Sequence, residues 1–299
     1  MKVLVWLVLC AIWGTTWIFI KFGLEAGIPP FTLASARFLI AIIGLIAIVS
    51  FGRIAIPRDR AQWRLILITG ILQFTVNYSL VFWSEQYITS GLAAVLQSMI
   101  SVFGLALSWF YLPEEKIDGL KVLAVVIGII GVAVVFYEQL ILQNTLAFLG
   151  SVAIIVGAYA AAHASILVKA RASGMHPASL VLGQMVCGLA PMLLLAAGEG
   201  NPFGLNWTAT ALFSVFYLAV PGTIGAFWLY YWLLGQIEST KAMMISLVTP
   251  IIAVLVGFVF GDEKMPATIM LGGFLILAGI GLILFRRRAS LNPAFDTTL

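Results

Sequence analysis

Two ionisable side chains, those of Arg37 and His163, lie inside long apolar runs of the sequence. The imidazole of His163, one helical turn after Tyr159, titrates near neutral pH and could carry a proton or bind a carboxylate. As a neutral packing residue it would be inert. Arg37 could pair with Glu25 or Glu85, or extend toward water. Because ionisable groups in apolar segments suggest function, we expect His163 and Tyr159 to contact a small molecule, and Arg37 to have a gating or structural role.

Uncharged polar residues recur at helical spacing a little further along the chain. Gln73, Asn77 and Ser84, with Tyr78 beside them, would share roughly one face of a helix. That face could form the wall of a cavity that hydrogen-bonds a polar small molecule. It could equally tie neighbouring helices together.

Aromatic residues gather in two other apolar runs. Trp228, Tyr230 and Tyr231 follow Thr223, and could line a cavity for an apolar group or a flat cation, or simply pack. The first apolar run would supply a facing wall. We predict a binding site formed by Trp13, Thr16, Trp17, Gln73, Asn77, Tyr78, Tyr159, His163, Trp228 and Tyr231.

Three residues are predicted to gate or shape this site rather than to bind: Arg37, Gln184 and Pro250. A proline inside a helix frees a backbone carbonyl, so Pro250 could mark a hinge or a static bend. The two cysteines, Cys10 and Cys187, lie in apolar runs without metal-ligand spacing around them. We therefore expect no catalytic residue, no metal and no cofactor.

The composition identifies the elements that must position these residues. The chain has 299 residues, of which 62% are hydrophobic and 9% charged, with a mean hydropathy of +1.11. Soluble domains carry about 25% charged residues, which excludes a soluble enzyme, a nucleic-acid binder and a disordered chain. We expect an all-α membrane protein, because lipid offers no partner for unpaired backbone groups.

Ten apolar runs are each long enough for a transmembrane helix of about 20 residues. They lie at about 3–22, 31–51, 64–83, 91–112, 119–137, 145–168, 178–197, 208–234, 241–260 and 267–285.

The positive charges predict the orientation of these ten spans. If both termini are cytoplasmic, thirteen of the sixteen Lys and Arg residues fall in cytoplasmic segments, and two, Lys21 and Lys264, fall outside. Cytoplasmic loops of membrane proteins are enriched in Lys and Arg. We therefore predict a multi-pass protein with both termini, including a short tail, in the cytoplasm.

The chain also divides into two similar halves. A shift of 148 positions places Glu115 on Glu263 and Gly131 on Gly279, and a shift of 147 places Pro30 on Pro177. Each half has five spans, so the two copies must be inverted relative to each other. We predict five-helix repeats over 1–140 and 141–299, an architecture typical of alternating access around a central site. A duplicated chain contains both halves, so we expect a monomer or a weak homo-oligomer.

The segment "AIWGTTWIFIKFGLEAGIPPFTLASARFLIA" from Ala11 to Ala41 resembles the EamA-type transporters of the drug/metabolite transporter superfamily. "SLVTP" at Ser246–Pro250, followed by "FGDEK" and "GGFLILAGIGLIL", is similarly typical. The resemblance covers essentially the whole chain. It implies an inner-membrane exporter of amino acids, related metabolites or drugs, without specifying which.

The sequence departs from the pattern of this superfamily at two places. Val102 stands where the second half has Pro250, which predicts no proline kink in the fourth span. Small multidrug members couple to protons through a glutamate in the first span, but here the first acid, Glu25, follows that span. Protons are still a candidate coupling ion, carried by another group, and facilitated export is the alternative.

We weigh three functions for this chain: a carrier, an intramembrane enzyme, and a channel or receptor-like sensor, the last disfavoured by the inverted repeat. A carrier that exports a small molecule through the lipid bilayer is favoured by the inverted repeat. A nucleotide-driven pump is excluded for this chain alone, because it has no phosphate-binding loop. An intramembrane enzyme or a channel is the alternative, the former weakened by the lack of a nucleophile–base pair.

Overall fold

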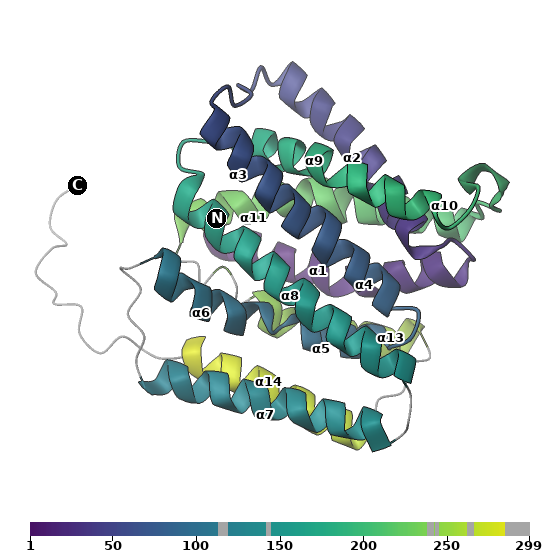
Figure 1. The fold of residues 1–299 in the computed structure, drawn as a ribbon, viewed down its shortest axis with the longest axis vertical. Helices are drawn as coiled ribbons and strands as arrows, with labels where there is room; N and C mark the ends of the chain where they lie inside the picture. Colours follow the sequence, from purple (N-terminus) through teal and green to yellow (C-terminus); the bar gives the residue numbers. More distant parts are fainter. Residues whose placement is uncertain (113–118, 142–144, 238–241, 243–244, 262–265, 285–299) are drawn as a thin grey trace, which may run out of the picture.

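The computed structural model describes the chain except for residues 113–118, 142–144, 238–241, 243–244, 262–265 and 285–299 (Figure 1). The described residues form helices and no strand. The elements are α1 (Lys2–Glu25), α2 (Pro30–Phe51), α3 (Arg60–Gly70), η1 (Ile71–Asn77), α4 (Tyr78–Ser84), α5 (Ser90–Gln97), α6 (Ile100–Tyr111), α7 (Gly119–Ile141), α8 (Thr145–Arg171), α9 (Pro177–Ala197), η2 (Pro202–Gly204), α10 (Ala209–Ala219), η3 (Val220–Gly225), α11 (Ala226–Gln236), α13 (Ile245–Phe260) and α14 (Ala267–Leu284).

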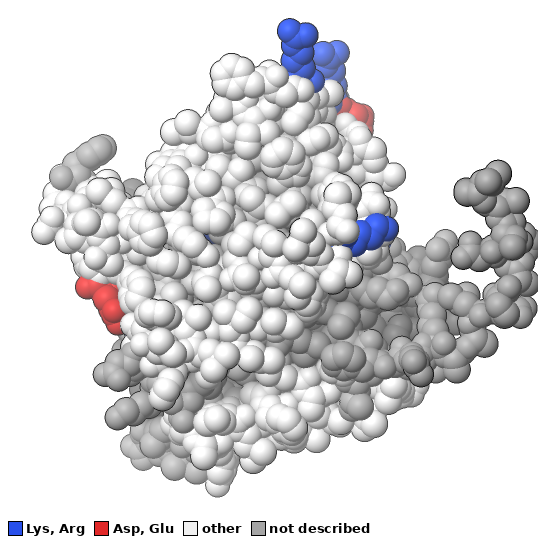
Figure 2. Space-filling model, turned by 180° about the vertical axis from the view of Figure 1, so that it is seen from behind, with Lys and Arg blue, Asp and Glu red and all other residues white. Residues whose placement is uncertain are grey.

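These helices confirm the prediction of an all-α membrane protein. Within the described parts of the chain, seven helices are long and apolar enough to cross a bilayer. Three shorter apolar segments, Val126–Val135, Val248–Phe260 and Ala267–Gly279, fall inside the other three predicted spans. In Figure 2 the few charged side chains of the described residues lie mostly near the edges of the face, and the remaining described surface is almost entirely uncharged. Such a surface suits contact with lipid.

Two of the predicted spans contain a π-helical segment instead of running as plain α-helices. One is η1, between α3 and α4, and the other is η3, between α10 and α11. Pro221 in η3 has no N–H to donate, and the Thr223 hydroxyl donates to the Leu218 carbonyl at 2.7 Å. In η1 the Thr75 hydroxyl donates to the Gly188 carbonyl of α9 at 2.7 Å. Such π-segments often mark functional sites.

The fourth predicted span is also interrupted. The helix stops after Gln97 and resumes at Ile100, with a turn at Ser98 and Met99. The Ser98 hydroxyl donates to the Val95 carbonyl at 2.6 Å and stabilises this turn. The fourth span therefore lacks a proline kink, as Val102 predicts, but it contains a different interruption at Ser98 and Met99.

Helices from distant parts of the sequence pack in pairs. Helix α1 packs on α13, α2 on α9, and α6 on α8. Helices α7 and α14 lie side by side at the bottom of Figure 1 and contact each other more than they contact the remaining helices. The orientation that the charges predict rests partly on Lys116, Lys241, Lys264 and Arg286–Arg288, which lie outside the described residues, as do Glu115 and Glu263.

Glu199, which lies just after α9, caps the start of α2. Its carboxylate accepts hydrogen bonds from the backbone N–H groups of Phe31 at 2.9 Å and Thr32 at 2.7 Å, and from the Thr32 hydroxyl at 2.8 Å. The first N–H groups of a helix have no partner within it, and a negative charge there is favourable.

We expect Glu199→Ala to lower the free energy of unfolding by about 1–2 kcal/mol, as the loss of other helix N-caps does. Thermal unfolding of the purified protein in detergent measures this. The control is Glu25→Ala. It removes an exposed carboxylate whose Oε1 lies 3.9 Å from the Lys21 Nζ. Equal effects of the two substitutions would contradict the role of Glu199 as a cap.

Candidate functional site

One cavity lies among the helices that carry the predicted polar and aromatic residues. It encloses about 860 Å³, including its open mouth. Its wall contains residues from α1, α2, η1, α4, α5, α6, α8, α11 and α13. The lining residues are Trp13, Thr16, Trp17, Ile20, Arg37, Gln73, Asn77, Tyr78, Val81, Ala94, Gln97, Ser98, Ile100, Ala161, Ser165, Phe227, Tyr230, Ala242, Ile245, Ser246 and Thr249.

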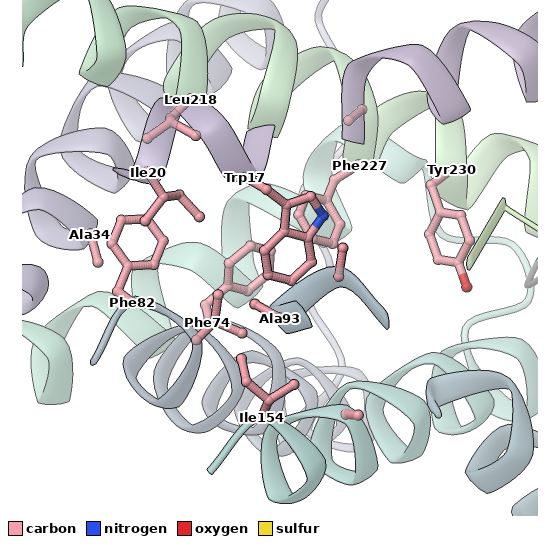
Figure 3. Close-up of a cluster of buried hydrophobic side chains, with 14 of the residues drawn as sticks. Trp17, Ile20, Ala34, Phe74, Phe82, Ala93, Ile154, Leu218, Phe227 and Tyr230 are labelled. Carbon is pink, nitrogen blue, oxygen red and sulfur yellow. The ribbon is translucent and has the colours of Figure 1, made fainter. Parts of the chain in front are cut away.

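Aromatic rings from three helices form one part of the wall. The ring of Trp13 in α1 lies 5.6 Å from that of Phe227 and 5.2 Å from that of Tyr230, both in α11. Phe227 lies 6.3 Å from Tyr78 in α4. Figure 3 shows Trp17 and Phe227 among the buried side chains of the interior. This part of the wall suits an apolar or aromatic group.

Amide and hydroxyl groups form another part of the wall. The Gln97 side-chain N–H donates to Asn77 Oδ1 at 3.1 Å, and the hydroxyl of Ser246, also in the wall, lies 2.6 Å from that of Ser101, which does not line the cavity. Two buried atoms on lining residues, Trp13 Nε1 and Gln97 Oε1, have no hydrogen-bond partner among the described residues. Trp13 and Gln97 thus keep an unpaired donor and an unpaired acceptor beside the cavity.

Arg37 contributes a charge to the same wall. Its Nε and one Nη donate to the Thr223 hydroxyl at 3.1 and 2.6 Å, and the same Nη approaches the Gly222 carbonyl at 3.5 Å. Its guanidinium carbon lies 4.6 Å from the centre of the Tyr78 ring. Neither alternative considered for Arg37 is found: its hydrogen bonds go to a hydroxyl and a carbonyl of η3 rather than to Glu25 or Glu85, and its 1% exposure excludes extension toward water.

Six of the ten predicted binding residues line the cavity: Trp13, Thr16, Trp17, Gln73, Asn77 and Tyr78. The other four, Tyr159, His163, Trp228 and Tyr231, do not.

The helical period explains why His163 and Tyr159 lie elsewhere. In α8 the cavity is lined by Ala161 and Ser165. Each is two positions from His163, which is about 200° around a helix of 3.6 residues per turn. His163 Nε2 instead lies 3.0 Å from the Tyr111 hydroxyl of α6. Tyr159 is 44% exposed and packs against His163.

The same reasoning applies to α11, where Phe227 and Tyr230 line the cavity and their neighbours do not. Trp228 faces the ring of His176, 6.3 Å away. Tyr231 is buried against the rings of Phe227 and Tyr230.

Gln184 and Pro250, which were predicted to gate or shape the site, are buried outside the cavity wall. Gln184 donates to the Thr69 hydroxyl at 2.7 Å, and Pro250 lies inside α13.

Sequence reasoning missed several polar lining residues, including Gln97, Ser98, Ser165, Ser246 and Thr249. The predicted internal repeat holds a signal that could have found some of them. Adding 148 to Trp17 gives Ser165, and adding 148 to Ser98 gives Ser246.

We expect His163→Ala to change transport by less than about twofold and to leave its pH dependence unaltered, because the imidazole contacts Tyr111 and not the cavity. The measurement is uptake into proteoliposomes between pH 5.5 and 8, a range that spans the usual titration of histidine. A flattened pH profile in this variant would contradict this prediction and indicate that His163 carries a proton during transport.

Comparisons with known proteins identify relatives of this chain along almost its whole length. Residues 1–137 and 148–285 match the family model described as the EamA-like transporter family. A transporter of Bacillus subtilis, YoaV, is 25% identical over 90% of this chain and 91% of its own length. The probable amino-acid metabolite efflux pump of Escherichia coli K12 is 25% identical over 94% of each chain.

Two further similarities concern localisation and fold. The inner membrane transporter YedA of Escherichia coli K12 is 28% identical over 85% of this chain and 81% of its own length. A protein of known crystal structure superposes with a TM-score of 0.69 over 95% of this chain and 96% of its own, at 16% identity. At that identity the likeness concerns the fold alone.

Proposed function

The chain belongs to the EamA-like transporter family and is a membrane transporter, and on this premise we propose that it exports small amphipathic metabolites across the inner membrane by alternating access. Amino acids and related compounds are the first candidates, drugs the second. The efflux pump of Escherichia coli named above supports this direction and substrate class. An intramembrane enzyme or a channel is the alternative.

The observation that carries the proposal is that equivalent positions of both halves line one cavity. These positions are separated by 148 residues in the sequence, or by 149 in the third and eighth spans. The pairs that line the cavity are Trp13 and Ala161, Trp17 and Ser165, Ala94 and Ala242, Gln97 and Ile245, Ser98 and Ser246, Tyr78 and Phe227, and Val81 and Tyr230. A central site between two repeats is typical of alternating-access carriers.

The packing of the helices supports the same division into halves over 1–140 and 141–299. Helix α1 packs on α13 and α6 packs on α8, so the first span contacts the ninth while the fourth contacts the sixth. An exchange of the two halves converts one pair into the other. The family model, which matches over 1–137 and 148–285, supports boundaries close to these.

The two π-segments occupy equivalent places, because η1 starts at Ile71 and η3 at Val220, 149 positions later. Each is held by the second span of the opposite half. Arg37 of α2 donates to Thr223 in η3, and Gln184 of α9 donates to Thr69, just before η1. We propose that Arg37 and Gln184 thereby couple the halves as one rocks against the other, with Pro250 as a bend in α13.

Reconstitution into liposomes tests the proposal. Counterflow of labelled amino acid into vesicles preloaded with unlabelled amino acid is expected to saturate and to exceed the flux into empty vesicles. A flux that never saturates would indicate a channel, and chemical conversion of the amino acid would indicate an enzyme. Accumulation of labelled amino acid in vesicles without preloaded substrate, driven by an imposed pH gradient, would identify protons as the coupling ion.

A second experiment tests the proposed orientation. Single cysteines introduced at Lys2 and at Arg58, in a background without Cys10 and Cys187, should react with an impermeant reagent only after the cells are opened. Labelling in intact cells would contradict cytoplasmic termini.

A further inference from the structure

Arg37 carries a buried positive charge that no acidic side chain among the described residues neutralises. The residue is 1% exposed, and its hydrogen bonds go to the hydroxyl of Thr223 and the carbonyl of Gly222, both neutral acceptors. The Thr223 hydroxyl gives its proton to the Leu218 carbonyl, so only its lone pairs face the guanidinium. Arginine is seldom fully buried unless it is paired, because removing a charge from water is costly.

Aromatic rings hold the guanidinium in place without neutralising it. Its central carbon lies 4.6 Å from the Tyr78 ring centre, 5.4 Å from that of Phe38 and 5.6 Å from that of Phe82. Rings at such distances attract a cation, and they fix the plane of its five donors. Thr223 and Gly222 accept from Nε and one Nη, which leaves the N–H groups of the other Nη to donate to a carboxylate.

The charge is confined to one side of the cavity. Arg37 is the only charged residue among the described side chains of its wall. The equivalent residue of the second half, Gln184, is neutral, does not line the cavity and is committed to Thr69. A fixed positive charge in a protein interior attracts an anion and repels a cation more strongly than it would in water.

We propose that Arg37 is the specificity-determining residue of this cavity, which takes compounds bearing a carboxylate beside an apolar or aromatic body and excludes cations that lack one. The carboxylate supplies the missing counter-charge, and the rings of Trp13, Phe227 and Tyr230 contact the apolar body. This inference rests on the proposed function in that it treats the cavity as the substrate site. It narrows that proposal, because it removes cationic drugs from the candidates.

The test uses compounds that differ only in their charged groups. Phenylalanine, 3-phenylpropanoate and 2-phenylethylamine share one aromatic body and carry respectively both charges, the carboxylate alone and the ammonium alone. Leucine, 4-methylpentanoate and isopentylamine form a second series. Binding to the purified full-length protein in detergent is measured by calorimetry for the wild type, Arg37→Met, Arg37→Lys and a control, Lys21→Met, which removes a positive charge outside the cavity wall.

The wild type and the control are expected to bind the carboxylates at least tenfold more tightly than the amines. Arg37→Met, which keeps an unbranched side chain without the charge, should lose at least tenfold in carboxylate affinity and none in amine affinity. Arg37→Lys should fall between them, because it retains the charge but not the planar donors. If Arg37→Met does not fold, the comparison of carboxylates with amines in the wild type still tests the inference.

Three results would overturn the inference: equal binding of amines and carboxylates by the wild type, no binding of any carboxylate at 10 mM, or unchanged selectivity in Arg37→Met. Counterflow separates this inference from the proposed function. Selective binding without saturable counterflow would defeat the transport proposal and leave the inference standing. Saturable counterflow with equal binding of carboxylates and amines would support the transport proposal and overturn the inference about Arg37.

Discussion

Replacing Gly70 with alanine is expected to remove most of the folded protein, although the substitution adds only one carbon atom. A Cβ on Gly70 would lie 2.5 Å from the carbonyl oxygen and 2.9 Å from the Cα of Gln184. Both atoms belong to the backbone of α9, which cannot move aside as a side chain can. We expect a loss of about 3 kcal/mol in stability, at the upper end of the usual cost of overpacking.

The same substitution should also disturb the cavity. Displacing α9 from α3 would strain the hydrogen bonds from Gln184 to Thr69 and from Thr75 to the Gly188 carbonyl. These bonds flank and hold η1, which carries Gln73 and Asn77 in the cavity wall. Any protein that still folds is therefore expected to bind substrate at least tenfold more weakly.

Gly235→Ala is the matched control for this prediction. Gly235 also lies in a membrane helix, α11, but a Cβ there would meet no atom within 4 Å. Alanine is favoured over glycine in helices by about 0.5–1 kcal/mol, so this variant should be slightly more stable than the wild type. Yield by size-exclusion chromatography and the unfolding temperature measure both effects. A Gly70→Ala variant as stable as Gly235→Ala would contradict the close approach of α3 and α9.

The helical elements were predictable because lipid restricts the choice. An apolar run such as 31–51 must satisfy its backbone groups internally, so it forms the helix Pro30–Phe51. The π-segments and the turn at Ser98 were not predictable in this way. In η1 the Thr75 hydroxyl donates to the distant Gly188 carbonyl, a contact that no local pattern specifies. The bonds in η3 and at Ser98 are local, but they use threonine and serine, which regular membrane helices also contain.

The candidate site was predictable where large or polar residues face the interior. Gln73, Asn77 and Trp13 stand out among apolar neighbours, and all three line the cavity. Ala161 and Ser165 give no such signal, because small residues are common throughout membrane helices. His163 stands out most and yet lies elsewhere, because Tyr111 on a neighbouring helix gives it a hydrogen-bond partner away from the cavity.

Replacing Gly131 with alanine is expected to separate α7 from α14 while leaving the cavity intact. A Cβ on Gly131 would lie 2.6 Å from the Gly272 carbonyl oxygen and 2.8 Å from the backbone nitrogen of Ile276. A Cβ on Gly272 would in turn lie 2.7 Å from the Gly131 carbonyl oxygen. The two helices thus meet backbone to backbone, as small residues allow in membranes, and alanine should cost about 2–3 kcal/mol.

This prediction differs from the one for Gly70 in what the surviving protein can do. None of the described residues of α7 or α14 lines the cavity, so folded Gly131→Ala protein should bind substrate within about twofold of the wild type, at a lower unfolding temperature. The control is Gly119→Ala in the same helix, where a Cβ would meet no atom within 4 Å. If Gly131→Ala weakened binding as much as Gly70→Ala, the α7–α14 pair would be part of the machinery that shapes the cavity. If it left the unfolding temperature unchanged, the contact between Gly131 and Gly272 would contribute nothing to the fold.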